Sequence, residues 1–457
     1  MNMTVSMQMA QAVAGLSLDQ LDDDVREKCA QSVIDTVGLS VAALETDYGQ
    51  SVRQAFDDSG PATIFGVDAG FSADAAAIVN GTCGHGEDFD NTFEGCPVHS
   101  GVVMVPAILA AMEKYQLPAK QGALGLVIGT EVMCRLGLVA NKYVHAAGFH
   151  PTAVLGAMSA AIGVSVARGL QPAQIVNAVG VAGSMASGII EYLADGSSTK
   201  RLHPGWAAHC GLRASAMGAA GFSGPASVFE GEHGFFYAFA RMKEVDFSLL
   251  LDGLGQRWVT TDLAFKPFAC GTMTQPYVDC AIELAGLGLD MDQIDAIECE
   301  VGEGTVHRLW APAHIKQAPP TAYAAKFSGP YCVAAGLLYR DAGLAAFTQA
   351  SVSDHQALAI AAKVRHIVDP HNPYPANYTG HVRLQMRDGT VHEVRRPCLR
   401  GGAQAPMTTS EIVAKCAANL AFSGRDRAGA TQLFEFAQKL MSGSSTLQVS
   451  SLRRIGA

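Results

Sequence analysis

The sequence predicts a mainly α protein, in which a large all-helical domain is interrupted by a smaller α+β lid domain. Hydrophobic residues make up 49% of the 457 residues and charged residues only 16%, so the chain can bury a large core. Apolar residues recur at helical spacing up to residue 265, whereas the alternation typical of strands follows. Helical spacing then returns near the C-terminus. We therefore predict a helical domain over residues 1–265 and 404–457, and an α+β domain over residues 266–403.

The first part of the chain is predicted to be a series of helices. Within residues 25–41, apolar side chains recur at every fourth position, as an amphipathic helix requires. Pro151 stands at a favoured first position of an apolar helix that runs to Arg168. The segments after it contain almost only small or aliphatic residues, which predicts interior helices. The helices expected after the first one are 100–115, 120–140, 151–168, 172–193 and 204–221.

The segment after Lys266 combines strand and helix patterns. Asp388-Gly389 is a strong hairpin signal between two alternating runs. After Pro397 helical patterns return, and Thr408 and Glu411 have the spacing of a capping box. We expect strands at 294–301, 364–368, 381–386 and 390–394, and helices at 276–285, 322–339, 355–362, 408–420 and 428–441. The last residues, 442–457, are expected to form a mobile tail.

Composition and cysteine usage exclude several classes of protein. The formal charge is −10, with 42 acidic and 32 basic residues and no basic run, which argues against nucleic-acid binding. The 11 cysteines are scattered singly without a CxxC motif, which indicates free thiols in a reducing compartment. The longest uncharged apolar stretch, 153–167, is shorter than the roughly 18 to 20 residues that a bilayer requires, and no signal peptide is evident. We expect a cytoplasmic protein that does not bind membranes.

The first cluster of polar residues is an acidic loop from His85 to Thr92, followed by His99. A solvated loop with helix caps is one interpretation. The DxDxT pattern at 88–92 matches a phosphatase nucleophile loop, but no buried apolar strand precedes it. A calcium loop fails because Phe93 stands where the turn requires glycine. His85, Asp88 and His99 could bind a transition metal, but they lack a helical ligand spacing, and we predict no metal.

Two further clusters precede predicted helices. His150 lies just before a helix N-terminus, which suits an anionic ligand, although a loop histidine alone is more often merely hydrogen-bonded. Lys200, Arg201 and His203 follow a Gly/Ser-rich turn, where a desolvated lysine can act as a base; the alternative is solvated surface charge. Residues 197–200 also spell SxxK, but the companion KTG and SDN motifs of serine acyl-enzymes are absent. No nucleotide-binding glycine motif occurs.

Together these clusters resemble the MmgE/PrpD family, whose members include 2-methylcitrate dehydratase, cis-aconitate decarboxylase and iminodisuccinate epimerase. The resemblance covers nearly the whole chain. It implies a helical domain interrupted by a lid, a site between them, a homodimer, and no metal or organic cofactor. The motifs that carry it are 87–92, 148–152, 199–203 with Gly205 and 207–208, 221–224 with 229–231, and 326–328 with Tyr331.

The resemblance implies a set of site residues. Catalytic roles are expected for Asp88, His99, His150, Lys200 and Tyr331, and substrate contacts for Thr92, Arg201, His203, Lys266 and Gln275. Two positions depart from the family pattern. His99 follows a longer spacer and precedes serine instead of proline, and Gln275 stands where many members carry a histidine.

The chemistry implied is proton abstraction alpha to a carboxylate, which needs a base and cations that stabilise enolate-like charge. Lys200 or His150 would be the base, His99 or Tyr331 the acid, and Asp88 would hold a histidine or lysine in its working protonation state. We expect a lyase that acts on a small di- or tricarboxylate, like 2-methylcitrate dehydratase. An epimerase with the same residues, or an inactive dimeric binding protein, is the alternative.

Overall fold

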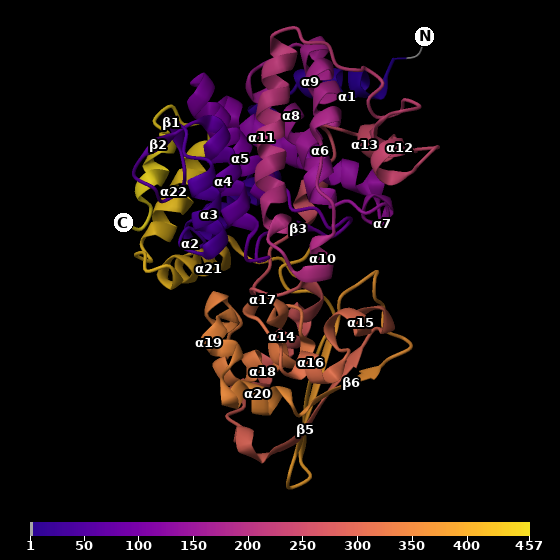
Figure 1. The fold of residues 1–457 in the computed structure, drawn as a ribbon, viewed down its shortest axis with the longest axis vertical. Helices are drawn as coiled ribbons and strands as arrows, with labels where there is room; N and C mark the ends of the chain where they lie inside the picture. The colour runs from indigo at the N-terminus through magenta and orange to yellow at the C-terminus, as the bar shows by residue number, and fades with distance from the viewer. Residues whose placement is uncertain (1–2) are drawn as a thin grey trace. The chain divides into compact units, whose positions relative to one another are not determined.

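Contacts within the chain divide it into two units. The computed structural model describes residues 3–457. The first unit contains residues 3–86, Asp90–Ala264 and Thr408–Ala457, and the second contains Glu87–Phe89 and Phe265–Met407. Helices make up 57% of the chain and strands 9%, with the small sheet in the C-terminal part, which confirms the predicted mainly α fold (Figure 1). That residues 266–403 form a lid domain, with these boundaries, stays a prediction.

The first unit is built almost entirely from helices. Its helices are α1 Val5–Ala14, α2 Asp23–Ala42, α3 Asp47–Ala55, α4 Ala73–His85, α5 Gly101–Tyr115, α6 Ala119–Ala140, α7 Tyr143–Ala146, α8 Pro151–Ala167, α9 Pro172–Met185, α10 Tyr192–Asp195, α11 Thr199–Ala219, α12 Phe235–Ala240, α13 Ser248–Leu251, α21 Thr409–Phe422 and α22 Gly429–Met441. Two antiparallel pairs of short strands accompany them: β1 Ser59–Thr63 with β2 Gly70–Phe71, and β3 Thr92–Phe93 with β4 Leu263–Ala264.

Small residues let the central helices of this unit pack closely. Helix α11 packs against α4, α8 and α9. A Cβ at Gly81 of α4 would lie 2.6 Å from the Cα of Gly205 in α11, and a Cβ at Gly211 would lie 2.3 Å from the Cβ of Ala160 in α8. Larger side chains would clash with the neighbouring helix at both points. The glycines therefore bring together the ends of α4, α8 and α11, which carry the histidines described below.

Helix α6 is, by length and composition, apolar enough to cross a membrane, but 89% of its most apolar window is buried inside the structure, as in a core helix. It also buries the ion pair of Glu131 and Arg135, whose Oε1 and Nε are 2.6 Å apart. Glu131 accepts hydrogen bonds from the amide and hydroxyl of Thr260, and Arg135 donates to carbonyls of the segment 249–257. The buried charges are thus compensated.

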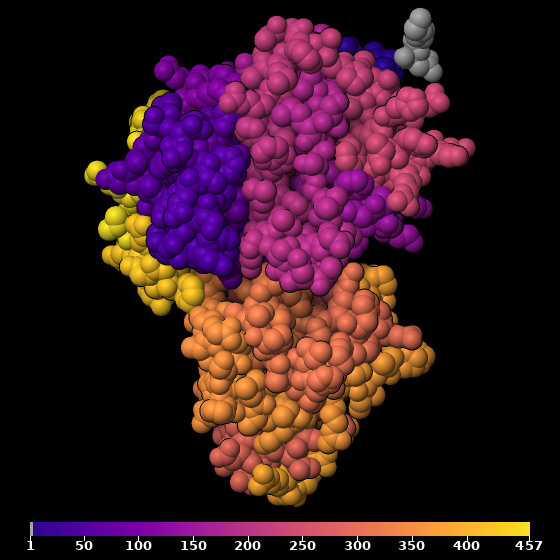
Figure 2. All heavy atoms as spheres, viewed as in Figure 1, coloured from indigo at the N-terminus to yellow at the C-terminus, as the bar shows by residue number. Residues whose placement is uncertain are grey.

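The C-terminal segment of the chain packs on the first helices, and Figure 2 shows the two surfaces, yellow and indigo, side by side. Helices α21 and α22 both contact α2. The capping box is confirmed, because the Thr408 amide donates to Glu411 and the Glu411 amide donates to Thr408. The predicted mobile tail is wrong: Val449 and Leu452 in a 3-10 helix, and Ile455 after it, are buried.

Two predicted helix boundaries in this unit are also wrong. Helix α11 begins at Thr199, so Pro204 lies inside the helix instead of opening it. A proline there removes the amide that would bond to the carbonyl of Lys200 and brings its ring close to that carbonyl, a cost that the helix tolerates. Helix α9 ends at Met185, and the chain then runs extended through Ala186 instead of continuing to residue 193.

The second unit is an α+β structure around one four-stranded sheet. Its helices are α14 Gln275–Gly286, α15 Val306–Leu309, α16 Ala313–Gln317, α17 Ala322–Ala325, α18 Gly329–Tyr339, α19 Gln349–Val352 and α20 His355–Ala361, and its strands are β5 Ile294–Val301, β6 Val364–Val368, β7 Gly380–Met386 and β8 Val391–Arg396. The strand order is β6-β5-β7-β8, with β5 and β6 parallel and the other pairs antiparallel. The four predicted strands are confirmed, and Gly389 makes the hairpin turn with a φ of 87°. The predicted helix 322–339 is two helices, separated at Ser328, whose side chain caps α18.

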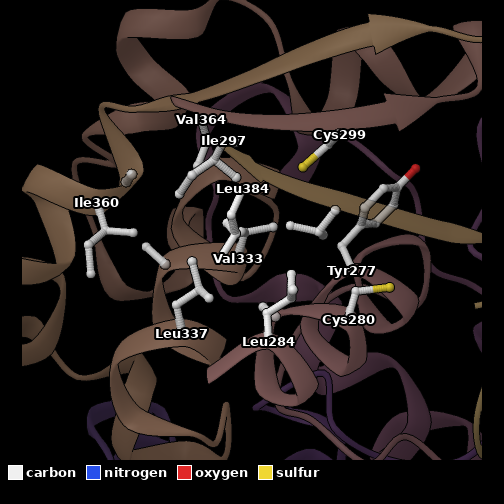
Figure 3. Close-up of a cluster of buried hydrophobic side chains, with 14 of the residues drawn as sticks. Tyr277, Cys280, Leu284, Ile297, Cys299, Val333, Leu337, Ile360, Val364 and Leu384 are labelled. Atoms are coloured by element: carbon white, nitrogen blue, oxygen red, sulfur yellow. The ribbon is translucent and has the colours of Figure 1, made fainter. Parts of the chain in front are cut away.

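One face of this sheet packs on α14, α18 and α20 (Figure 3). Leu284 of α14, Val333 and Leu337 of α18, and Ile297 and Leu384 of the sheet are all at most 2% exposed. The alternation that predicted β5 places one set of its side chains in this cluster, because successive strand residues face opposite sides.

Candidate active site

Four buried histidines of the first unit gather at the ends of helices. His85 is the last residue of α4, His99 lies just before α5, His150 caps α8, and His203 lies in the first turns of α11. The loop before α8 is fixed, since the amide of His150 donates to the carbonyl of Gly188 over 2.9 Å. Ring centroids of neighbouring histidines are 4.7 to 6.4 Å apart. These helix ends therefore form one imidazole cluster.

A single carboxylate orients two of these rings. The Nδ1 atom of His85 lies 3.0 Å from one oxygen of Asp90, and the Nδ1 atom of His99 lies 3.0 Å from the other. The Nδ1 of His99 is also 3.0 Å from the carbonyl of Asn91. Because carboxylates and carbonyls only accept, both Nδ1 atoms carry hydrogen. In a neutral ring the lone pair is then on Nε2, and the Nε2 of His85 has no hydrogen-bond partner among residues 3–457.

The other two histidines bond to each other. The Nδ1 atoms of His150 and His203 are 3.1 Å apart, so one donates and the other accepts. Whichever ring donates has an unprotonated Nε2, provided that both rings are neutral. Tyr192 contacts both rings edge-on, with centroids 6.2 and 5.9 Å away. A pocket of about 640 Å³ in this unit includes His203, Tyr192, Ile189 and Trp206 in its wall.

The electrostatics keep the rings of His85, His150 and His203 neutral. The pKa of His85 and of His203 is lowered to about 4, with burial as the largest cause and the positive charge of Lys200 as a further one. Burial, with His85 and Lys200, also holds the pKa of His150 well below its ordinary value. Burial opposes ionisation of Asp90, but the hydrogen bonds from His85 and His99 favour its charged form, and the pKa of this carboxyl lies well below the usual range. The cluster therefore combines neutral imidazoles, one carboxylate and a nearby ammonium group.

Acid should destabilise the fold through these histidines. In the unfolded chain each titrates near 6.5, whereas in the fold His85 and His203 titrate at about 4. Below pH 6.5 the unfolded chain takes up protons that the folded chain does not, so stability falls as the pH falls. From pH 6.5 to 4.5 we expect a loss of about 2 to 3 kcal/mol of unfolding free energy for each residue. Urea unfolding followed by circular dichroism measures this loss, and His203→Gln should remove one residue's share. An unfolding free energy that is constant over this range would contradict the assignment.

Other predicted residues of the first unit have defined partners. Thr92 is buried in β3, opposite Ala264. Arg201 is tied to the protein: its Nε donates to the carbonyl of Gly86 over 3.0 Å, and its guanidinium lies 4.6 Å from the ring centre of Tyr48. It therefore fixes the end of α4 behind His85.

The predicted residues of the second unit form their own ion pairs. Lys266 is buried and donates to the carbonyl oxygen of Asp88 over 2.7 Å and to its carboxylate over 3.2 Å. The backbone of Asp88 is left-handed, with a φ of 53°. Beside it, Lys326 lies 2.7 Å from the carboxylate of Glu87. Asp88 thus pairs with Lys266; that it holds a histidine or lysine in its working protonation state stays a prediction.

Two predicted residues of this unit are engaged elsewhere. The amide of Gln275 is fully buried; it accepts from the Phe268 amide and donates to the carbonyls of Phe268 and Cys270. Tyr331 is also fully buried, its hydroxyl donates to the carbonyl of Ala346 over 2.8 Å, and burial raises its pKa. Both side chains stabilise local backbone, so we leave them out of the proposed machinery.

Sequence reasoning underestimated His85 and Asp90. We considered His85 only as a metal ligand, with Asp88 as the carboxylate. The structure brings Asp90 to His85 and His99, and their ligand atoms all lie within 4.8 Å of one another, close enough to hold a metal ion. The high density of ionisable residues in the loop indicated a site, but it did not indicate which carboxylate contacts the histidines.

Comparison with known proteins places the chain in a class. Residues 7–248 match the MmgE/PrpD N-terminal domain, and residues 268–435 match the MmgE/PrpD C-terminal domain. The chain therefore belongs to the MmgE/PrpD family, as the sequence motifs predicted.

Three relatives similar in sequence to this chain are named as cis-aconitate decarboxylases or as like them. The chain is 26% identical to the cis-aconitate decarboxylase of Homo sapiens, in an alignment that covers 91% of this chain and 88% of that protein. It is 25% identical to the cis-aconitate decarboxylase of Mus musculus, over 91% and 86%. It is 24% identical to the cis-aconitate decarboxylase-like protein oryM of Aspergillus oryzae, over 89% of each. Family and relatives together support a lyase-type enzyme.

Proposed function

We propose that the chain is a lyase that needs no cofactor, removes a proton alpha to a carboxylate of a small di- or tricarboxylate, and then eliminates water or carbon dioxide. The observation that carries this proposal is the cluster of neutral, buried histidines beside Lys200. A proton next to a carboxylate is weakly acidic, so its removal requires a positioned base and nearby positive charge. The His150–His203 pair supplies a base, and Lys200 supplies the charge.

The proposed roles follow from the hydrogen bonds. His150 takes the substrate proton; the alternative base is Lys200 in its neutral form, which would then supply no positive charge. His99 takes up a proton from solvent on Nε2, which makes it an imidazolium beside Asp90, and then returns that proton to the substrate, because its Nδ1 hydrogen is engaged by Asp90 and Asn91. Asp90 is a positioning residue that fixes the tautomers of His85 and His99. Thr92 is proposed to bind a substrate oxygen.

A proton NMR assay in deuterium oxide tests the proposal. Small carboxylates, with cis-aconitate first because relatives are named for it, are screened by thermal shift and then incubated with the protein in EDTA. We expect a new vinylic signal or release of carbon dioxide. His150→Gln is the matched control and should abolish the change.

The other outcomes select different functions. Exchange of a substrate C–H proton without net reaction would assign an epimerase, which uses the same base with return of the proton to the opposite face. Stabilisation with neither change would leave a binding protein. Turnover only after divalent metal is restored would overturn the cofactor-free mechanism and assign a metal to His85, Asp90 and His99.

A further inference from the structure

We propose that the pocket beside His203 binds a hydrocarbon substituent of the substrate, so that the chain acts on di- or tricarboxylates that carry an alkyl chain longer than methyl. This inference rests on the proposed function and names the substrate class of the same site. The pocket has a volume of about 640 Å³, which is enough to enclose a whole small ligand and far more than one methyl group fills. His203 belongs both to the pocket wall and to the histidine pair, because its Nδ1 lies 3.1 Å from that of His150.

One wall of this pocket is a stripe along α11. Its members recur at positions i, i+3, i+4 and i+7, which share one face of a helix. They are Thr199, Leu202, His203 and Trp206. Lys200 is a neighbour of His203 on the helix surface, three residues before it, and its charge acts on both His150 and His203. The ammonium group and the histidine pair therefore lie towards the start of the stripe, and Trp206 lies at its other end.

The other wall belongs to the segment 187–195, which is fixed against the loop of His150. The amide of His150 donates to the carbonyl of Gly188 over 2.9 Å. In the same segment Tyr192 contacts the rings of His150 and His203, with centroids 6.2 and 5.9 Å away. The wall is thus held in register with the histidine pair. An alkyl chain bound in the pocket would bring the carboxylates of the same molecule to the proposed base.

The chemistry of the wall suits a hydrocarbon and not a further carboxylate. Ile189 and Trp206 are large apolar side chains that are 60% and 36% exposed. Apart from His203, the ionisable residues that line the pocket in the described part of the chain are Glu191 and Asp195, and both are acidic. A carboxylate placed beside them would be repelled, whereas an alkyl chain would cover apolar surface and gain the free energy of its burial.

Binding of a homologous series tests the pocket without any need for turnover. Succinate and its methyl, butyl and octyl derivatives carry the same two carboxylates, and isothermal titration calorimetry gives the Kd of each for the intact chain at neutral pH in EDTA. We expect the Kd to fall about fourfold for each methylene added between methyl and butyl, the effect of burying one methylene group. Octylsuccinate should bind more tightly than butylsuccinate. A Kd that does not fall with chain length would overturn the proposal.

Matched variants locate the bound alkyl chain. Ile189 lines the pocket, whereas Leu193 is similarly exposed, at 63%, and is not among the residues that line it. Ile189→Ser and Trp206→Ser should each raise the Kd of octylsuccinate about tenfold and leave that of succinate nearly unchanged. Leu193→Ser should change neither value. A length dependence that survives both wall variants would overturn the proposal, because the alkyl chain would then bind elsewhere; the exposed Ile189 keeps the test falsifiable if Trp206→Ser does not fold.

Turnover distinguishes a failure of this proposal from a failure of the proposed function. In the NMR assay, kcat/KM should rise with the length of the alkyl substituent. Length-dependent binding without turnover of any carboxylate would support the pocket as a ligand site and overturn the proposed function. Turnover of short carboxylates without a length dependence would support the function and overturn the pocket. A dimer that Ile189→Ser dissociates, together with a Kd independent of chain length, would assign the wall to a contact between two copies and overturn the pocket as well.

Discussion

Replacing His150 with glutamine should lower the turnover number about 10²- to 10⁴-fold, the range expected when one positioned acid–base group is removed. Glutamine can preserve the contact with the Nδ1 of His203, but its amide nitrogen cannot take a proton at neutral pH. The backbone of residue 150 caps α8 and its side chain does not, so the helix should remain. Turnover is measured on the carboxylate that the NMR screen identifies, and thermal unfolding reports the fold.

Lys200→Met tests whether the lysine is the base or acts only through the positive potential of its ammonium group. Its charge lowers the pKa of His85, His150 and His203, so its removal should raise all three. If Lys200 acts only through this field, the acid limb of the pH–rate profile should move to higher pH and part of the rate should remain. If it is the base, the rate should fall as far as in His150→Gln. The exposed His233 and Lys142, changed to Gln and Met, are the controls. Wild-type turnover in both His150→Gln and Lys200→Met would refute the assignment.

Local patterns predicted those parts of the fold that local physics determines. Strands 294–301 and 364–368 were predicted with the bounds observed. In β5, which lies between two neighbouring strands, one face packs on the apolar cluster, and its apolar and polar side chains therefore alternate. The turn at Gly389 needs a positive φ, a conformation that glycine favours, so the sequence alone predicts the turn. In both cases the decisive information lies within a few residues.

The wrong predictions came from contacts between distant residues. The segment 442–457 is short of long apolar runs, yet Val449, Leu452 and Ile455 are buried against the rest of the first unit. Their spacing of three residues fits the 3-10 helix that forms there, but only tertiary packing stabilises so short an element. Pro204 likewise suggested a helix start, whereas the helix begins at Thr199.

The candidate site divides in the same way. Motif spacing found His99, His150, Lys200 and His203, which the structure brings into one cluster or close to it. The spacing did not predict which carboxylate of the acidic loop contacts the histidines. The choice depends on how the loop turns after the left-handed residue Asp88, and no spacing rule states that.

Asp90→Asn should lower the turnover number about 10²- to 10⁴-fold while the Michaelis constant changes little, because the carboxylate orients the rings and touches no substrate in the proposed mechanism. Both Nδ1–H groups now donate to Asp90. An asparagine can accept with its oxygen, but its NH₂ group would face the other Nδ1–H, so one ring must turn or change tautomer. Asp90→Glu, which keeps two acceptor oxygens, should recover part of the rate.

A matched control exists in the same unit. An oxygen of the Asp74 carboxylate lies 3.1 Å from the Nδ1 of His209. Asp74 is in α4 and His209 in α11, the helices that carry His85 and His203, but this pair lies outside the histidine cluster. Asp74→Asn removes a carboxylate from a histidine in the same way, and it should lower thermal stability without lowering turnover. A merely structural Asp90 would behave like Asp74, with reduced stability and a normal turnover number for the folded fraction. Because the Asp90 charge raises the pKa of His85, Asp90→Asn should also lower that pKa further, which histidine titration by NMR measures directly.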